Sequence, residues 1–432
     1  MIDTIKKILK KIDVDHWKIL DKTVESKELF FIRKDLDMNR AKKVHSYGIT
    51  LYKDFEEKGE WYTGSASVNV STGMEEDQIF SILEKAALSA SFVKNPYYPM
   101  VELSEKVQPR FQSRFDTADV MPFMSDFRDC LYKNDIFDKG GINSAEIFLG
   151  KSELRLMTST GIDVRFKKFN GEIELITDWN ENNESVELYN MFYFSDFCPE
   201  LIEEEAKIQI ENSRDRALAI QAKELKKINI ILSTDAVKDV MNFYVSHSSA
   251  SAVYEQISKA KIGEIFQGEN VKGDLLNIKL NPFMINSPDS APYDDDGFPL
   301  SEQILFEKGV LKKIHGSLQY TSYLKLEPTG TIHNVEVQGG TKSYEDFKKE
   351  PYVEILNFSD FQMNTMTGDF GGEIRLARYF DGEKIVPITG ASISANLFTI
   401  QHEMYLSKEV TQRDNYIGPR ALLFPNGHIA GA

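Results

Sequence analysis

Histidine residues are the first to examine for metal chemistry, and in this chain they are scattered. There are seven of them, and none has a second histidine within one or two helical turns. A zinc protease needs two histidines at a fixed offset so that both imidazoles reach one ion. The single His-Glu pair, His402-Glu403, is followed by Met-Tyr-Leu-Ser, which cannot supply the second imidazole. The sequence contains no local zinc-protease motif, and we expect no metal ligand or cofactor in this chain.

An acidic run, DDDG at 294–297, invites comparison with a calcium-binding loop. An EF-hand loop would need an oxygen ligand where Pro292 stands and a bidentate glutamate where Gln303 stands. The run is therefore predicted to be a solvated turn.

Nucleophilic chemistry has no recognisable motif either. There is no P-loop, no G-x-S-x-G elbow and no G-x-G-x-x-G at a strand–helix junction. Serines flank His247, but neighbours in sequence do not make a catalytic triad, so this segment is predicted to be a loop or a helix start. The two cysteines, Cys130 and Cys198, are expected to be reduced, partly buried thiols of a cytoplasmic protein.

The N-terminal half shows strands followed by a helix, twice. Residues 48–70 alternate apolar and polar side chains around a charged, glycine-containing turn, which predicts a hairpin. A helix is predicted to open at Thr72, with Glu75 completing a capping box. Residues 144–178 predict three or four strands broken at glycines, and Pro199 then begins a long helix.

These patterns predict an α+β protein in two domains. Residues 1–226 are expected to form an α/β domain built from a repeated strand–helix unit. From 227 to 432 a short strand (228–232) and a helix starting at Asp235 are followed by short strands, with frequent Gly and Pro between them. That region is predicted to be a mainly β domain.

Charge and hydropathy exclude two classes of partner. The net charge of −16 argues against a nucleic-acid-binding surface, because phosphate binding requires clustered Lys and Arg. No window approaches the roughly 20 apolar residues that span a bilayer. The first twelve residues alternate Ile and Leu with Lys at helical spacing, which predicts an amphipathic surface helix rather than a signal peptide.

The C-terminal half resembles the TldD/PmbA family, whose members have been called modulators of DNA gyrase. The family has an acid-rich D-G-x-P turn, a strand ending in an N/K-G turn, and a helix with Y-x-A/S-x-x-L before a T/S-G pair. The matching residues are Asp296, Gly297, Pro299, Lys308, Gly309, Tyr320, Ser322 and Gly330.

Further segments extend this resemblance over most of the chain. MNTMTGDFGG (363–372) resembles the family's N-x-x-T-G-D-F segment. ASISANLF (391–398) resembles its G-N-L segment, with Ala395 in place of the glycine. The match is looser before residue 290, where HSYGITLYKD and LRLMTSTGIDV resemble two early family strands.

The resemblance implies a cytoplasmic, two-subunit metalloprotease that cleaves peptides. One member type carries zinc on an H-E-x-x-x-H segment and a distant cysteine. The corresponding segment here, NFYVSHSSASAVYEQ, has only His247, and no cysteine follows Cys198. The resemblance is therefore to the metal-free PmbA/TldE type, which pairs with a zinc-bearing TldD-like homologue. Nothing in this acidic sequence supports a link to gyrase.

The leading hypothesis is a non-catalytic subunit that completes the chamber for unfolded or extended peptides in a zinc-bearing partner. The candidate substrate-binding residues are Thr367, Gly368, Asp369 and Phe370, although a tight turn that needs Gly368 explains them as well. The alternatives are a self-associating, non-enzymatic peptide-binding protein and an enzyme of unrecognised mechanism. The partner expected is the zinc-bearing homologue, with a homodimer as the other possibility when the chain is alone.

Overall fold

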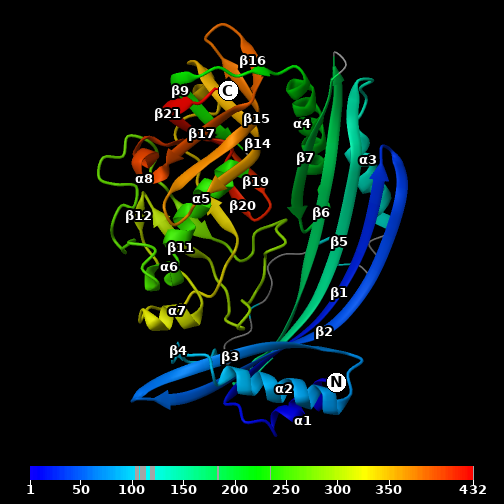
Figure 1. Cartoon of the computed structure of the whole chain (residues 1–432), viewed down its shortest axis with the longest axis vertical. Coiled ribbons are helices and arrows are strands. Elements are labelled where there is room, and N and C mark those ends of the chain that lie inside the picture. Colours follow the sequence, from blue (N-terminus) through cyan, green and yellow to red (C-terminus); the bar gives the residue numbers. More distant parts are fainter. Residues whose placement is uncertain (103–106, 108–112, 117–121, 182–183, 234, 432) are drawn as a thin grey trace.

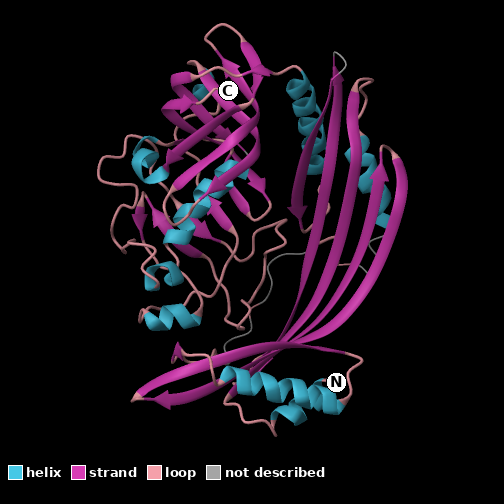
Figure 2. Ribbon diagram, viewed as in Figure 1, coloured by secondary structure: helices cyan, strands magenta, loops and turns pink. Residues whose placement is uncertain are grey.

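The protein has two parts that lie side by side along its length (Figure 1). The structure, a computed structural model, describes the chain except for residues 103–106, 108–112, 117–121, 182–183, 234 and 432. Long strands of the N-terminal part curve along one side, and shorter strands of the C-terminal part form a compact body on the other (Figures 1 and 2). The expected α+β class with a strand-rich C-terminal region is confirmed.

The N-terminal part is built on one seven-stranded sheet with the order β4-β3-β2-β1-β5-β6-β7. Strands β1 and β5 pair antiparallel, so the three-stranded unit β1-β2-β3 and the three-stranded unit β5-β6-β7 form one continuous sheet, and β4 pairs with the outer side of β3. A helix follows each unit, α2 after β3 and α4 after β7. The elements of this part are α1 (Ile2–Leu9), β1 (His16–Ile32), β2 (Asp35–Glu57), β3 (Glu60–Ser71), α2 (Glu76–Ala90), β4 (Asn95–Pro96), α3 (Pro122–Tyr132), β5 (Gly140–Thr158), β6 (Asp163–Glu181), β7 (Glu184–Phe194) and α4 (Pro199–Ala217).

Helices cover one face of this sheet at its two ends, α1 and α2 at one end and α3 and α4 at the other (Figure 1). Because side chains alternate across a strand, the odd-numbered residues of β1 share a face. Ile19 packs in a core with α1 and α2, while Leu29 and Phe31 pack in a separate core with α3 and α4. The even-numbered residues of β1 point to the opposite face.

Two details of the predicted N-terminal elements are wrong. Helix α2, which was predicted to open at Thr72, begins at Glu76, since the capping box forms between Glu75 and Gln78. Residues 144–178 form two long strands, not three or four. Gly171 lies inside β6, where its missing side chain makes room for the ring of Phe194, so this glycine serves packing and does not end the strand.

The C-terminal part contains a six-stranded sheet, β12-β11-β10-β13-β20-β19, and an eight-stranded sheet, β18-β21-β9-β14-β15-β16-β8, with β17 beside β15. Helix α5 packs in the large core between them. The strands are β8 (Ile220–Gln221), β9 (Leu225–Ser233), β10 (Ile278–Leu280), β11 (Gln303–Glu307), β12 (Val310–Leu311), β13 (Val335–Val337), β14 (Tyr352–Met363), β15 (Asp369–Phe380), β16 (Ile385–Thr389), β17 (Ala391–Asn396), β18 (Tyr405–Leu406), β19 (Val410–Arg413), β20 (Tyr416–Pro419) and β21 (Ala421–Ile429).

The helices of this part are short except for the first. They are α5 (Asp235–His247), α6 (Ala250–Tyr254), α7 (Leu318–Tyr323) and α8 (Leu397–Ile400), with 3-10 turns η1 (Glu345–Lys348) and η2 (Gln401–Glu403). Among the described residues, no helix combines the length and the apolar run needed to cross a bilayer.

A buried arginine, Arg413, joins the two parts. The Arg413 side chain at the end of β19 donates to Asp235 at the start of α5, at 2.7 Å, and to Glu205 of α4, at 3.2 Å. It also donates to the side chain of Asn190 and to the carbonyl oxygen of Met191 on β7. The Arg413 residue is about 9% exposed, and its guanidinium makes five hydrogen bonds. These bonds link the C-terminal part to α4 and β7 of the N-terminal part.

Candidate functional site

A cavity of about 470 Å³ lies at the C-terminal end of α5. Its lining mixes apolar side chains with histidines, serines, threonines and asparagines, and includes no Asp, Glu, Lys or Arg. The polar lining residues are Asn242, Ser246, His247, Ser249, Ser251, His315, Thr331, His333, Thr365 and Asn415. Such a lining can donate hydrogen bonds to neutral groups such as peptide amides and accept them in return.

Helix α5 positions His247 in this cavity. The helix buries apolar side chains along most of its length, and it ends at His247 because Ser249 caps the next helix, accepting a hydrogen bond from the backbone N–H of Ala252 at 3.2 Å. The prediction of a loop or helix start at this segment therefore describes the junction of α5 and α6.

The His247 ring is buried among aromatic rings without hydrogen bonds. Only 3% of the residue is exposed, and its ring centroid lies 4.5, 5.3 and 5.4 Å from those of Phe243, Phe266 and Phe398. Neither ring nitrogen makes a hydrogen bond of ordinary geometry to the described part of the chain. Burial lowers the pKa of His247, and the nearby backbone of Thr365 opposes this only in part. The ring is therefore neutral and unsatisfied, which costs folding free energy.

His315 is a second buried histidine of the same cavity, but it is satisfied. Its Nε2 lies 3.0 Å from the carbonyl oxygen of Val245. Burial lowers the pKa of His315, the bond to Val245 opposes this, and the neighbouring His333 lowers it further. His315 and His333 come from loops far from α5 in sequence, and no spacing in the chain predicted that they would meet His247.

The residues present do not fit the zinc ion that the family resemblance implies. Within the described ranges, no group of three or more His, Cys, Asp or Glu side chains is arranged to hold a metal. No carboxylate lines the cavity, so a general base of the kind that a metallopeptidase uses is missing from its lining. The cavity can hold a ligand by hydrogen bonds.

The four predicted site residues form a turn between this cavity and a second one. Thr365 and Met366, just before the turn, line the cavity at α5, whereas Phe370 lines a cavity of about 280 Å³ between β17 and β21. Gly368 has a φ of +77°, and a side chain there would meet the ring of Phe398 at 2.7 Å. The turn therefore requires glycine.

Asp369 and Thr367 have local structural partners. The Asp369 carboxylate accepts from the Thr367 hydroxyl and from the Asn396 side-chain amide, both at 2.8 Å. These two bonds, Asn396 first, lower the pKa of Asp369. Phe370 is buried in the core. Turn geometry thus explains three of the residues and packing the fourth, and their contact with substrate stays a prediction.

The prediction of a solvated turn at 294–297 is only partly right, because the segment forms a turn and Asp295 is exposed, but Asp294 and Gly297 are buried. Asp294 is 7% exposed and accepts hydrogen bonds from three backbone N–H groups. Burial, with the nearby Asp296, raises the pKa of Asp294 to about 6. Gly297, at φ +83°, packs against Leu156 and Ile162 of the N-terminal domain. Asp294 and Gly297 are therefore the buried residues of this turn, and Gly297 contacts the N-terminal part.

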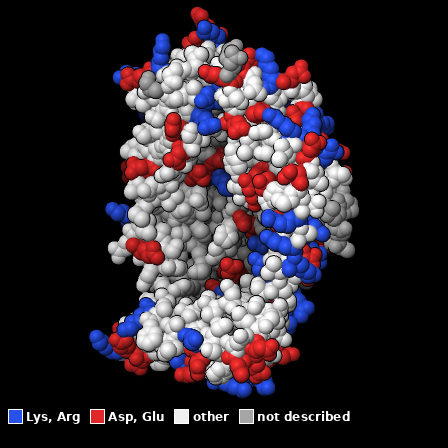
Figure 3. All heavy atoms as spheres, turned by 45° about the vertical axis from the view of Figure 1, so that its right-hand side comes forward, with Lys and Arg blue, Asp and Glu red and all other residues white. Residues whose placement is uncertain are grey.

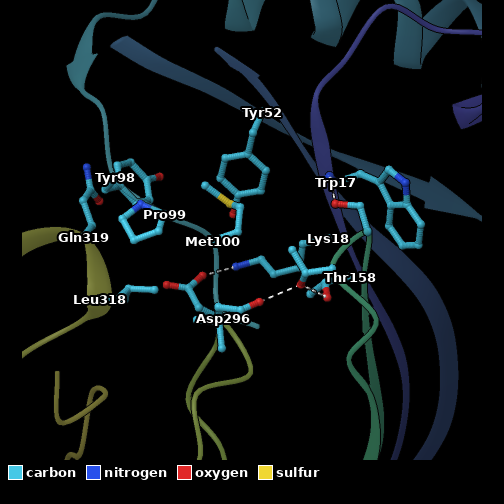
Figure 4. A pocket seen from close by; sticks show the side chains of 13 residues that line it. Trp17, Lys18, Tyr52, Tyr98, Pro99, Met100, Thr158, Asp296, Leu318 and Gln319 are labelled. Carbon is cyan, nitrogen blue, oxygen red and sulfur yellow. Dashed lines mark hydrogen bonds and ion pairs between the residues drawn. The ribbon is translucent and has the colours of Figure 1, made fainter. Parts of the chain in front are cut away.

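A small pocket lies beside this turn, between Asp296 and residues of the N-terminal part such as Lys18 (Figure 4). Lys18 of β1 donates to Asp296 at 2.6 Å across the pocket. Burial alone would lower the pKa of Lys18, but the Asp296 carboxylate outweighs it and the pKa is raised. With about 30 Å³ of free space, the pocket has room for roughly one water molecule.

The fold and the cavity at α5 define a two-domain α+β protein of a known architecture. TldE from Thermococcus kodakarensis superposes with a TM-score of 0.79 at 17% identity, covering all of both chains. A candidate modulator of a DNA gyrase from Thermotoga maritima superposes with a TM-score of 0.77 at 19% identity, covering 99% of each chain. At these identities the likeness establishes the fold.

The sequence comparisons then give the family. Residues 225–431 match the PmbA/TldA metallopeptidase C-terminal domain. An uncharacterized protein of Methanocaldococcus jannaschii is 26% identical over 292 residues, which span 61% of this chain and 64% of that protein. Residues 225–431 therefore carry the C-terminal domain of the TldD/PmbA family, as the residues at 294–331 and 363–372 indicated.

Proposed function

We propose that this chain is the zinc-free subunit of a TldD/PmbA-type peptidase and acts in the cytoplasm with a zinc-bearing homologue. The observation that carries the proposal is the cavity at the end of α5. By the sequence resemblance, His247 in its lining belongs to the segment that corresponds to the H-E-x-x-x-H segment of the zinc-bearing type, and no Asp or Glu is among the residues that line it.

The neutral lining favours an unfolded or extended peptide as the molecule held. Asn242 offers an amide donor and acceptor, and Ser246 and Ser251 offer hydroxyls. The amide nitrogen of Asn415 already donates to Asp289 and to the carbonyl oxygen of His333, so Asn415 offers only its side-chain oxygen as an acceptor. These groups match the repeated N–H and C=O groups of a peptide backbone, which any sequence carries. The visible face in Figure 3 has acidic and basic side chains interspersed, without a broad basic area of the kind that binds nucleic acid.

Purification of the chain alone and together with a zinc-bearing homologue from the same cell tests the subunit proposal. We expect hydrolysis of an unstructured peptide by the mixture only, and its loss on addition of a chelator. Activity of the lone chain that survives the chelator would instead indicate an enzyme of another mechanism. Failure to co-purify would favour the self-associating peptide-binding protein.

A substitution at the cavity mouth tests the role of the cavity. Asn242 is exposed and lies on α5, so a tryptophan there can fill the cavity without disturbing the core. We expect Asn242→Trp to abolish peptide binding by the complex and Asn242→Ala to weaken it only slightly. Equal peptide affinity in both variants would exclude the cavity as the binding site.

A further inference from the structure

The cavity between β17 and β21, on the other side of the 367–370 turn from the cavity at α5, has an apolar floor. Its volume is about 280 Å³. The floor is formed by side chains that are each 5–7% exposed and come from four strands, namely Ile230 of β9, Phe370 of β15, Ile393 of β17 and Phe424 of β21. An engineered cavity of roughly 150 Å³ with similar walls binds benzene, so this cavity has room for a bulky apolar group.

A bulge in β21 forms one wall of this cavity. The pairing of β21 with β9 changes register between Phe424 and Gly427, and the residues of the bulge line the cavity. Asn426 has a φ of +58°, and a side chain at Gly427 would meet that of Ile230 at 2.3 Å. Bulges are common next to binding sites, where they end the regular pairing and redirect side chains. The wall is therefore a specific feature of the fold.

The rim of the cavity carries a carboxylate in a fixed position. Glu403 ends the turn η2 and lines the cavity, and its Oε1 accepts from the side chain of Lys272. The backbone N–H groups of Lys272 and Gly273 both donate to the carbonyl oxygen of His402, at 2.7 and 3.0 Å, which holds η2 against this segment. The bond from Lys272 lowers the pKa of Glu403, so the carboxylate is charged at neutral pH.

The charge at the rim favours a cationic group on the ligand. Lys272 binds one oxygen of the Glu403 carboxylate, and a carboxylate accepts about four hydrogen bonds in all. Within the described ranges, the lining includes no Asp, Lys or Arg, so the fixed charge that faces the cavity is negative. The other polar side chains of the rim are Ser394, Thr399, His402, Asn426 and His428.

We propose that this cavity binds an amino acid through its bulky apolar side chain, while the primary ammonium group of the ligand pairs with Glu403. The apolar floor takes the side chain, and the carboxylate at the rim takes the ammonium group one carbon away. A free amino acid and the first residue of a peptide share this chemistry. The proposal is independent of the subunit proposal, because binding to the lone chain tests it without a partner and without hydrolysis.

Isothermal titration calorimetry of the purified chain tests the ligand class. We expect L-phenylalanine or L-leucine to bind, and L-alanine to bind at least about tenfold more weakly, since it buries less apolar surface. N-acetyl-L-phenylalanine, which lacks the ammonium group, should also bind about tenfold more weakly than L-phenylalanine. No binding of either bulky amino acid or its amide, or equal affinity for the acetylated form, would overturn the proposal.

The amide of the same amino acid distinguishes the two sources. L-phenylalaninamide keeps the ammonium group and the side chain but has an amide in place of the carboxylate, as the first residue of a peptide does. Binding of the amide as tight as that of L-phenylalanine, or tighter, supports the end of a peptide as the ligand. Binding of L-phenylalanine alone supports a free amino acid.

Two substitutions test the position of the site. Ala395 lines the cavity beside Phe370 of the neighbouring strand, so Ala395→Phe should fill the cavity and abolish binding. Ser392→Phe is the matched control, because Ser392 lies on the same strand, is exposed and is not part of the lining. Equal affinity of the two folded variants for L-phenylalanine would exclude this cavity.

The carboxylate can be tested even if Ala395→Phe fails to fold, because Glu403 lies at the rim. Glu403→Gln should raise the dissociation constant for L-phenylalanine about tenfold and leave that for N-acetyl-L-phenylalanine unchanged. A general disturbance of the cavity would weaken both ligands alike. Unchanged affinity for L-phenylalanine in this variant, or an equal loss for both ligands, would contradict the pairing of the ammonium group with Glu403.

Discussion

At the first residue of helix α5, the Asp235 carboxylate accepts two hydrogen bonds from Arg413, whereas at the last residue the ring nitrogens of His247 make none. Both Arg413 and His247 are more than nine-tenths buried. A buried polar group that is fully satisfied specifies how elements fit together, while one left unsatisfied costs stability and is retained for another reason. The start of α5 is thus a structural joint, and its end is the place to look for function.

Removal of the joint is expected to have the largest effect. Arg413→Ala leaves Glu205 and Asp235 without their shared partner and the carbonyl oxygen of Met191 without its donor. We expect the free energy of unfolding to fall by about 2–4 kcal/mol, less than for a fully buried ion pair because the Asp235 side chain is itself exposed, measured by urea denaturation. Arg155→Ala, which removes a surface pair with Asp163, should lower it by at most about 1 kcal/mol. If Arg413→Ala and Arg155→Ala lower the free energy of unfolding equally, Arg413 is no more important to the fold than a surface ion pair.

A side chain on the turn beside the cavity should give the next largest effect. Gly368→Ala adds a methyl group at a φ of +77° and against the Phe398 ring. We expect a loss of about 1–3 kcal/mol, read from the urea midpoint. Gly73→Ala is the matched control, because a methyl group there meets open space. If both variants unfold at one urea concentration, the turn does not need its glycine.

The two buried histidines should respond to leucine in opposite directions. His247→Leu removes an unsatisfied group and is expected to stabilise the fold by about 1–2 kcal/mol. His315→Leu leaves the carbonyl oxygen of Val245 without its partner and should destabilise it by about 1 kcal/mol. Thermal unfolding of both variants at pH 7 measures this difference. A destabilised His247→Leu would mean that the ring has a partner in solution.

The stability of the fold is expected to depend on pH through two buried groups, His247 and Asp294. Burial lowers the folded-state pKa of His247 below 6.5, so only the unfolded state binds a proton just below that pH. Stability is then lost as the pH falls through 6.5, by at most about 1.4 kcal/mol per pH unit. Asp294 acts in the opposite direction: its folded pKa is raised to about 6, so its contribution is lost as the pH rises through 6.

The variant His247→Leu separates the contribution of His247 to the pH dependence of stability from that of Asp294. Urea unfolding of the unaltered chain and of His247→Leu from pH 7 to pH 5 should show a difference that grows as the pH falls. A constant difference over that range would show that His247 titrates alike in the folded and unfolded chains.

The sequence allowed prediction of what depends on local pattern. The start of α5 at Asp235, the hairpin at 48–70 and the helix after Pro199 follow from periodicity and capping residues, and the structure contains all three. The family motifs at 294–331 and 363–372 predicted the C-terminal domain.

Features that depend on contacts between distant segments were not predictable. The acidic run at 294–297 is polar in sequence, and only the approach of Leu156 and Ile162 shows that Gly297 is buried. Likewise His315 and His333 reach the cavity from loops, and Arg413 links residues about 200 positions away. The fold class can be predicted from local sequence patterns. A cavity lined by residues from several distant loops cannot, because its residues have no characteristic spacing in the sequence.

The central claim is that this chain supplies a binding surface and a zinc-bearing homologue supplies the chemistry. The most direct measurement is the rate at which a fixed amount of that homologue hydrolyses an unstructured peptide while this chain is titrated in. We predict that the rate rises to a plateau at an equimolar ratio and that this chain alone gives no hydrolysis. A rate that does not change on addition of the chain, or hydrolysis by the chain alone, would contradict the claim.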